Sequence, residues 1–266
     1  MSDQFLPHSE RLAACHWPEL LPRFDAALRE ALAFIFDRFA PIGVVATGTI
    51  IRGTPHRTSD LDICVIHREP FRERVQRYFN GVPAEIFVNP PHTIRTYFQD
   101  EHENARSIFA HMLATGFVVW ASDSTTETLR AEAKAWLAQP DGIAENWLTR
   151  SRYAAATQLE DAFDVIDSDP VAARMLLGRA VAAMIELECR KRTGRIPRGK
   201  DLISVLTTAD EGLGRLVSEF FSEAPLNEQC QTAGLIADRI LMARGFFEWD
   251  SGPENVEQEQ GKPIDL

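Results

Sequence analysis

Two aspartates separated by a single residue, Asp60 and Asp62, are the residues of this chain best suited to metal and phosphate chemistry. The segment at residues 61–66, which contains Asp62 and directly follows Asp60, has the apolar composition of a buried strand. Because residues i and i+2 of a strand point to the same side, both carboxylates would project together while their apolar neighbours point into a core. Such paired carboxylates repel each other unless a cation lies between them. They suit Mg²⁺, which usually binds through one or two carboxylates and the phosphates of a substrate.

A glycine turn precedes the aspartates. Gly48 follows an apolar segment, residues 43–46, that predicts another short buried strand. Glycine is expected where the backbone must come close to a phosphate, and Thr49 could donate its hydroxyl and amide to the β- and γ-phosphates. Arg52 lies in the same loop and could pair with phosphate oxygens, whereas a solvated loop charge explains Arg57 equally well.

These residues resemble the motif of the nucleotidyltransferase superfamily that includes DNA polymerase beta, kanamycin nucleotidyltransferase and the bacterial minimal nucleotidyltransferases. That motif is a Gly followed by Gly or Ser, then a loop, then Asp-x-Asp or Asp-x-Glu on a strand. Gly48, Thr49, Asp60 and Asp62 match it, with Thr49 keeping a hydroxyl where the family has Ser. Ser59 also fits the usual form, and it can hydrogen-bond locally in the turn. The resemblance is specific over residues 1–120 and is closest to bacterial two-domain, antibiotic-type enzymes.

The resemblance implies a third acid on a following strand. Glu85, in the predicted strand at residues 84–88, is the best match, and strand alternation places it on the same face as Phe87. The family more often has Asp there, and an exposed Glu paired with a neighbouring basic residue is the alternative. With the two aspartates, Glu85 would hold two Mg²⁺ ions and complete the catalytic site.

A general base must reach the proton of the acceptor hydroxyl. Either the third acid or an acid of the helical half could serve, and no motif chooses among the helical candidates, which are Glu145, Glu160, Asp161, Asp164 and Glu186. The basic loop at residues 195–200 loosely resembles a segment that reaches the triphosphate in two-domain nucleotidyltransferases. Lys200 and Arg198 are therefore candidate triphosphate contacts, although a charged loop beside acidic helices explains them nearly as well.

Composition bounds the class of protein. The chain has 266 residues, of which 45% are hydrophobic, enough for a well-buried core. Its formal net charge of −11 argues against a general nucleic-acid binder, because such proteins need a basic surface to neutralise phosphates. No apolar run approaches the length of a membrane span, and no secretory signal precedes the first helix, so a cytoplasmic location is expected. The four cysteines are scattered and are interpreted as reduced and structural.

Periodicity and turn signals divide the chain into an α/β part and a helical part. We expect a nucleotidyltransferase domain with a short mixed sheet at residues 1–122, an all-helical substrate-binding domain at 123–250 and an acidic disordered tail at 251–266. Helices are predicted at 17–39, 72–79, 105–113, 124–137, 143–166, 171–192, 200–206, 212–221 and 227–247. The remaining strands are predicted at 84–88 and 116–120. The helix at 124–137 would begin at a capping box formed by Ser124 and Glu127.

The predicted activity is Mg²⁺-dependent transfer of a nucleoside monophosphate, AMP in the simplest case, from a nucleoside triphosphate to a hydroxyl of a small molecule. The alternative is an antitoxin-like nucleotidyltransferase that modifies or binds a protein partner. Such systems usually divide the two halves between separate chains, whereas this chain carries both, which favours the small-molecule enzyme. The sequence does not identify the acceptor, the base of the nucleotide or the oligomeric state, for which a homodimer is one option.

Overall fold

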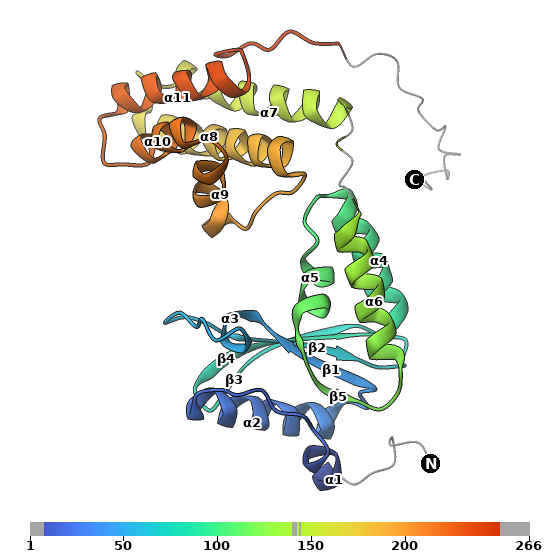
Figure 1. Ribbon diagram of the computed structural model, residues 1–266. Helices are drawn as coiled ribbons and strands as arrows, with labels where there is room; N and C mark the ends of the chain where they lie inside the picture. The colour runs from blue at the N-terminus through green and yellow to red at the C-terminus, as the bar shows by residue number, and fades with distance from the viewer. Residues whose placement is uncertain (1–7, 140–142, 144, 251–266) are drawn as a thin grey trace, which may run out of the picture. The chain divides into compact units, whose positions relative to one another are not determined.

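The computed structural model describes residues 8–139, 143 and 145–250 (Figure 1). The chain divides into two compact units, Met1–Asp141 and Gly142–Leu266. The first is an α/β unit and the second is helical, which confirms the predicted order of the two parts. The predicted acidic tail at residues 251–266 lies outside the described residues. None of the helices that the structure describes is long and apolar enough to span a bilayer.

A five-stranded mixed sheet forms the centre of the described part of the first unit, in the order β3-β4-β2-β1-β5. Only β2 and β4 run parallel to each other among the paired strands of this sheet. In this order, strand β2 lies in the middle of the sheet, between β4 and β1. The strands are β1 (Gly43–Thr47), β2 (Leu61–Ile66), β3 (Glu73–Phe79), β4 (Val82–Asn89) and β5 (Phe117–Ala121).

Helix α2 (Pro22–Arg38) covers one face of this sheet (Figure 1). Its fully buried side chains, Leu28 and Leu32 among them, share a hydrophobic core with Ile63 of β2 and with apolar residues of β1 and β4. The sequence predicts a helix from residue 17, whereas α2 starts at Pro22. Proline is favoured in the first turn because its missing N–H has no helical partner there. The short helix α1 (His8–Ala13) precedes α2 in the chain.

Three helices cover part of the opposite face: α4 (Pro91–Glu103), α5 (Ile108–Thr115) and α6 (Thr125–Ala138). Leu129 and Ala133 of α6 share a core with Cys64 and Ile66 of β2. The sequence predicts a domain boundary after residue 122, whereas the compact units divide after Asp141, because α6 is amphipathic and buries its apolar face on this sheet. Its first turn is closed by Asp123, whose Oδ1 accepts a hydrogen bond of 2.8 Å from the Thr125 N–H, and not by the predicted Ser124 side-chain cap.

The predicted helix at residues 72–79 is wrong, because this segment is strand β3. It pairs with β4 in an antiparallel hairpin whose register joins Phe79 to Val82. The two-residue loop is Asn80-Gly81, with φ values of 45° and 71°. Two successive positive φ angles are the requirement of a type I′ turn, for which Asn-Gly is the strongest sequence signal. Val75 and Phe79 pack on the core while Tyr78 is exposed, as strand alternation requires.

The second unit is a set of packed helices with its own core. Asp169 caps α8, since its Oδ1 accepts hydrogen bonds from the N–H groups of Val171 (3.1 Å) and Ala172 (3.0 Å). Gly194 ends α8 in the left-handed conformation at φ 77°. Both ends of α8 are therefore set by local sequence, an aspartate before the first turn and a glycine after the last. The elements are α7 (Glu145–Asp164), α8 (Pro170–Thr193), the 3-10 turn η2 (Gly199–Asp201), α9 (Leu202–Ala209), α10 (Glu211–Phe220) and α11 (Leu226–Ile240).

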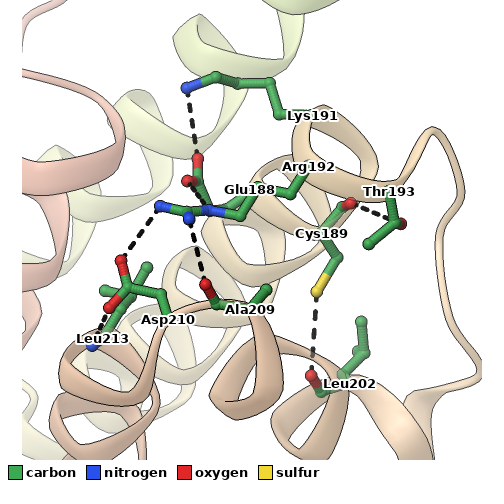
Figure 2. Close-up of polar contacts among 9 residues, drawn as sticks. All are labelled: Glu188, Cys189, Lys191, Arg192, Thr193, Leu202, Ala209, Asp210 and Leu213. Atoms are coloured by element: carbon green, nitrogen blue, oxygen red, sulfur yellow. Dashed lines mark hydrogen bonds and ion pairs between the residues drawn. The ribbon is translucent and has the colours of Figure 1, made fainter.

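A buried carboxylate joins the end of α8 to the helices that come after it (Figure 2). The Glu188 side chain is 7% exposed and forms ion pairs with Lys191 and Arg192. Arg192 also pairs with Asp210 at 3.1 Å, and Asp210 accepts a hydrogen bond from the Leu213 N–H at the start of α10. A buried carboxylate is tolerated only when it is paired in this way. The cluster is therefore structural.

Gly43→Ala should destabilise the first unit. A Cβ at residue 43 would lie 2.0 Å from Thr126 Oγ1 and 3.1 Å from Ile66 Cδ1. Overpacking of this kind costs about 1–3 kcal/mol, enough to lower the melting temperature by several degrees in thermal unfolding. Gly178→Ala in α8 is the control, because its Cβ meets nothing within 4 Å and alanine favours the helix. An unchanged melting temperature for Gly43→Ala would contradict the packing of α6 on the sheet.

Glu101 should make stability depend on pH. Burial raises the pKa of this carboxyl from 4.5 to about 7, although hydrogen bonds from backbone N–H groups of α5 oppose the rise. A raised pKa in the folded state means that the stabilisation is complete below pH 4.5 and is lost as the pH rises through about 7. In urea unfolding, Glu101→Gln should therefore gain stability relative to the wild type between pH 5 and pH 8.

The matched control for Glu101→Gln is Glu103→Gln, which removes one negative charge from an exposed position of the same helix. A stability difference between Glu101→Gln and the wild type that is the same at pH 5 and pH 8 would show that burial of Glu101 does not matter.

Candidate active site

The loop between β1 and β2 begins with a glycine in a conformation that other residues rarely adopt. Gly48 has φ +92° and starts the one-turn helix α3 (Gly48–Ile51). A Cβ on residue 48 would lie 2.6 Å from Oδ2 of Asp62. Glycine is therefore required here twice, once for the backbone angle and once for the close approach of the Asp62 carboxylate.

Thr49 and Ser59 close the two ends of this loop on each other. Their hydroxyl oxygens lie 2.7 Å apart, and Ser59 Oγ also accepts a 2.7 Å hydrogen bond from the His56 N–H. The Thr54 N–H donates to the Thr49 carbonyl at 2.9 Å. Residues 52–58, Arg52 included, are exposed, whereas Thr49, Ile51 and Ser59 are half-buried and Ile50 is buried. The outer part of the loop is thus exposed, and hydrogen bonds hold its two ends together.

Asp60 and Asp62 lie where β2 begins. Leu61, Ile63 and Val65 are fully buried in the core on the α2 side, whereas both aspartates are half-buried. Successive side chains of a strand point to opposite faces, so the Asp62 carboxylate lies on the face away from α2, and Asp60 immediately precedes the strand. The predicted alternation is confirmed within β2. Thr47, the last residue of β1, is the register partner of Asp62.

Glu85 of β4 is the register partner of Asp62 in the parallel pair β2–β4. Adjacent strands lie about 4.8 Å apart, and residues in register share a face, so the two carboxylates are neighbours. The two oxygens of Glu85 accept hydrogen bonds from β3: Oε2 from Arg74 at 2.7 Å and Oε1 from the Gln76 side-chain amide. The structure therefore brings Glu85 beside Asp62 and at the same time pairs it with a basic residue.

The donor set at this end of the sheet fits Mg²⁺. Within the part of the chain that the structure describes, no three His, Cys, Asp or Glu side chains are grouped closely enough to hold a metal ion. Two aspartates on one face still supply the hard oxygen atoms that Mg²⁺ prefers, and this ion usually completes its coordination with water and the phosphates of a substrate. The residues are therefore better suited to bind a metal ion that arrives with a triphosphate than to form a three-carboxylate metal site beforehand.

The cysteine beside the aspartates is not a candidate nucleophile. Burial and the neighbouring Asp62 charge both raise the pKa of the Cys64 thiol, so it stays protonated. All four cysteines are free thiols, and three of them are buried.

The remaining candidates lie apart from the aspartates and Glu85 in the chain. Lys200 is exposed on η2 in the second unit, and Arg198 is exposed and pairs with Asp201 at 2.7 Å. Of the helical acids, Glu160 and Glu186 are half-buried, Asp161 and Asp164 are exposed, and the side chain of Glu145 lies outside the described residues. The first unit therefore supplies the whole cluster of acids at the start of β2.

Sequence reasoning missed Arg74 and Gln76. Both lie in the segment predicted to be helical, where their side chains would point in unrelated directions. The signal that could have found them is the Asn80-Gly81 turn, because a two-residue hairpin sets the register that places Gln76 opposite Glu85.

A family model matches the part of the chain that holds the candidate site. Residues 26–113 match the family model described as Nucleotidyltransferase domain, and this range contains Gly48, Asp60, Asp62 and Glu85. No curated protein matches the chain. A crystal structure of a nucleotidyltransferase-like protein from Exiguobacterium sibiricum 255-15 is similar with a TM-score of 0.48 and 14% sequence identity, over 76% of this chain and 69% of that chain. On the family match, the amino-terminal unit of this chain contains a nucleotidyltransferase domain.

Proposed function

We propose that this protein catalyses the Mg²⁺-dependent transfer of a nucleoside monophosphate, AMP from ATP, to a hydroxyl of a small-molecule acceptor. The observation that carries the proposal is the placement of Asp62 between Gly48 and Glu85, within a domain that matches the nucleotidyltransferase family. Phosphate, metal and proton acceptor are the three requirements of nucleotidyl transfer, and each has a candidate residue at this end of the sheet.

Asp60 and Asp62 are the proposed metal ligands. Asp60 precedes β2 and Asp62 is its second residue, and the repulsion between two such carboxylates is relieved when a divalent cation binds with the triphosphate. When bound, Mg²⁺ would neutralise charge on the phosphate oxygens and favour departure of pyrophosphate. Two ions are expected from the family resemblance.

The turn at Gly48 is the proposed seat of the triphosphate. Gly48 carries no side chain that would hold a phosphate away from the backbone, and Thr49 offers its hydroxyl and amide. Ser59 holds the Thr49 hydroxyl in place through their 2.7 Å contact. Arg52 is exposed in the same loop, and we assign it to the phosphates as a cationic contact.

Glu85 is the proposed acceptor of the proton from the attacking hydroxyl. In the reaction the acceptor oxygen forms a bond to the α-phosphorus, its proton passes to the Glu85 carboxylate, and the bond from the α-phosphorus to the bridging oxygen breaks. That oxygen keeps the electron pair and leaves with pyrophosphate. A base within hydrogen-bond reach of the hydroxyl contributes typically 10²–10⁴-fold to the rate.

The charge of the chain supports a small acceptor. The net charge of −11 makes association with a long polyanion unfavourable, whereas it attracts a cationic small molecule.

Labelled ATP tests this proposal directly. ATP carrying the label at its α-phosphate should be incubated with Mg²⁺, the full chain, and an aminoglycoside panel, a cell extract or no acceptor. Label in a small molecule supports the proposal. Label in a protein supports the alternative of a partner-directed nucleotidyltransferase, and absence of transfer in every arm contradicts both.

Asp60→Asn and Asp62→Asn should each abolish transfer, because an amide in place of a carboxylate weakens a metal ligand and removes charge stabilisation of several kcal/mol from the transition state. The measurement is the rate of label transfer, with circular dichroism to check folding. Asp37→Asn, at an exposed position on α2, is the control for loss of one charge. If either variant turns over near the wild-type rate, the ligand assignment is wrong.

Gly48→Ala should reduce both ATP binding and turnover. The methyl group would lie 2.6 Å from Asp62 Oδ2, and the residue would have to adopt φ +92°, so the turn and the carboxylate must separate. A 1 Å misplacement at a reacting centre can cost about a hundredfold in rate. Gly53→Ala is the control, since it has a similar φ of +76° with nothing within 4 Å. Equal activity of the two variants would show that backbone strain alone matters.

A further inference from the structure

The edge strand β3 presents two hydrogen-bond donors to the candidate site. These donors, Arg74 and Gln76, are named the β3 clamp. They contact the two carboxylate oxygens of Glu85 separately: Arg74 contacts Oε2 at 2.7 Å and the Gln76 amide contacts Oε1. Neither residue belongs to the motif that suggested the activity.

We propose that the β3 clamp positions Glu85 for the reaction, with Arg74 and Gln76 fixing the orientation of its carboxylate beside Asp62. This inference rests on the proposed function. Neither residue touches the reacting groups, so both are positioning residues that act through Glu85.

The register of the hairpin explains how the clamp forms. Gln76 lies directly opposite Glu85, and Arg74 lies opposite Phe87, two residues further along β4. The Arg74 guanidinium lies 5.0 Å from the centre of the Phe87 ring while it donates to Glu85 Oε2. Direct and diagonal cross-strand neighbours of this kind are within reach of long side chains.

The alternation of β3 separates the clamp from the other cation of the strand. Arg77 points to the α2 side, where its guanidinium lies 4.9 Å from the centre of the Phe34 ring. Residues 74 and 76 therefore share the face of Glu85 and Asp62, whereas residue 77 belongs to the opposite face. The side chains of Arg74 and Arg77 thus lie on opposite faces of the sheet.

Stability alone gives little reason for this arrangement. The Arg74 side chain is 58% exposed, and exposed ion pairs contribute almost nothing to folding. Glu85, by contrast, is 22% exposed and has a flexible stem that must be held for its carboxylate to meet a reacting hydroxyl. A carboxylate has roughly four lone-pair sites, so two donors fix its plane and leave sites for a metal or a proton.

The test compares kcat and the KM for ATP in the label-transfer assay, with the acceptor identified by the screen. We expect the double variant Arg74→Met, Gln76→Leu to lower kcat about tenfold, because a loosely held base is misaligned in most encounters. The KM for ATP should change less than about twofold, because the triphosphate contacts are untouched. Arg74→Lys should recover part of the loss, since lysine keeps the charge but not the planar fork.

Two controls separate positioning from a general structural effect. Arg77→Met removes a cation from the same strand on the opposite face and should leave kcat unchanged. In a Glu85→Gln background, the two clamp substitutions should have almost no further effect on kcat, because residues that act as a unit are not additive. Melting temperatures of all variants check that they fold.

The outcomes distinguish the inference from the function on which it rests. An active wild type whose clamp variants retain wild-type kcat overturns the inference and leaves the proposed function standing. Equal losses with and without Glu85 also overturn it, because the clamp would then act elsewhere. A wild type that transfers no label with any acceptor overturns the proposed function itself, and the inference falls with it.

Discussion

The parallel pairing of β2 with β4 is the constraint on which the candidate site depends. It places Glu85 in register with Asp62, although more than twenty residues of chain separate them. Parallel strands cannot be joined by a tight turn, so the chain between them must cross over. Here the crossover contains the edge strand β3, which then pairs with β4 and brings two donors to the same face.

Side chains on the two faces of strand β2 have different roles. Every second residue of β2 is buried against α2, and this burial holds the strand in place. The intervening residues begin with the half-buried Asp62 and continue with Cys64 and Ile66, which α4, α5 and α6 cover. Because the cover stops short of the strand's first residues, the carboxylates keep access to solvent while their backbone is fixed on both sides.

Buried or half-buried acids in this chain have different roles that depend on their partners. Glu188 is surrounded by cations of its own helix, one of which also pairs with Asp210, and it joins helices of the second unit. Glu101 accepts hydrogen bonds from the start of α5, and burial raises its pKa to about 7. Asp62 is placed against a glycine that leaves room for it. The surroundings of each acid, and not its type, separate structural carboxylates from candidate ligands.

The sequence alone was sufficient for the features that depend on local order. Alternation along residues 60–65, the glycine turn at Gly48 and the caps of α8 all depend on neighbouring residues, and the structure agrees with them. The division into an α/β part and a helical part depends on periodicity in the same way. The resemblance of Gly48, Thr49, Asp60 and Asp62 to a known motif pointed to the domain that the family match supports.

Only the tertiary structure decided which strands are neighbours and which face each helix covers. The short segment at residues 72–79 is polar and amphipathic, and its state was settled by pairing with β4 rather than by its own propensity. Likewise, α6 joined the first unit because its apolar stripe fits the sheet. Strand pairing and helix docking are contacts between distant parts of the chain, so local periodicity does not contain them. The β3 clamp around Glu85 arises from such contacts alone.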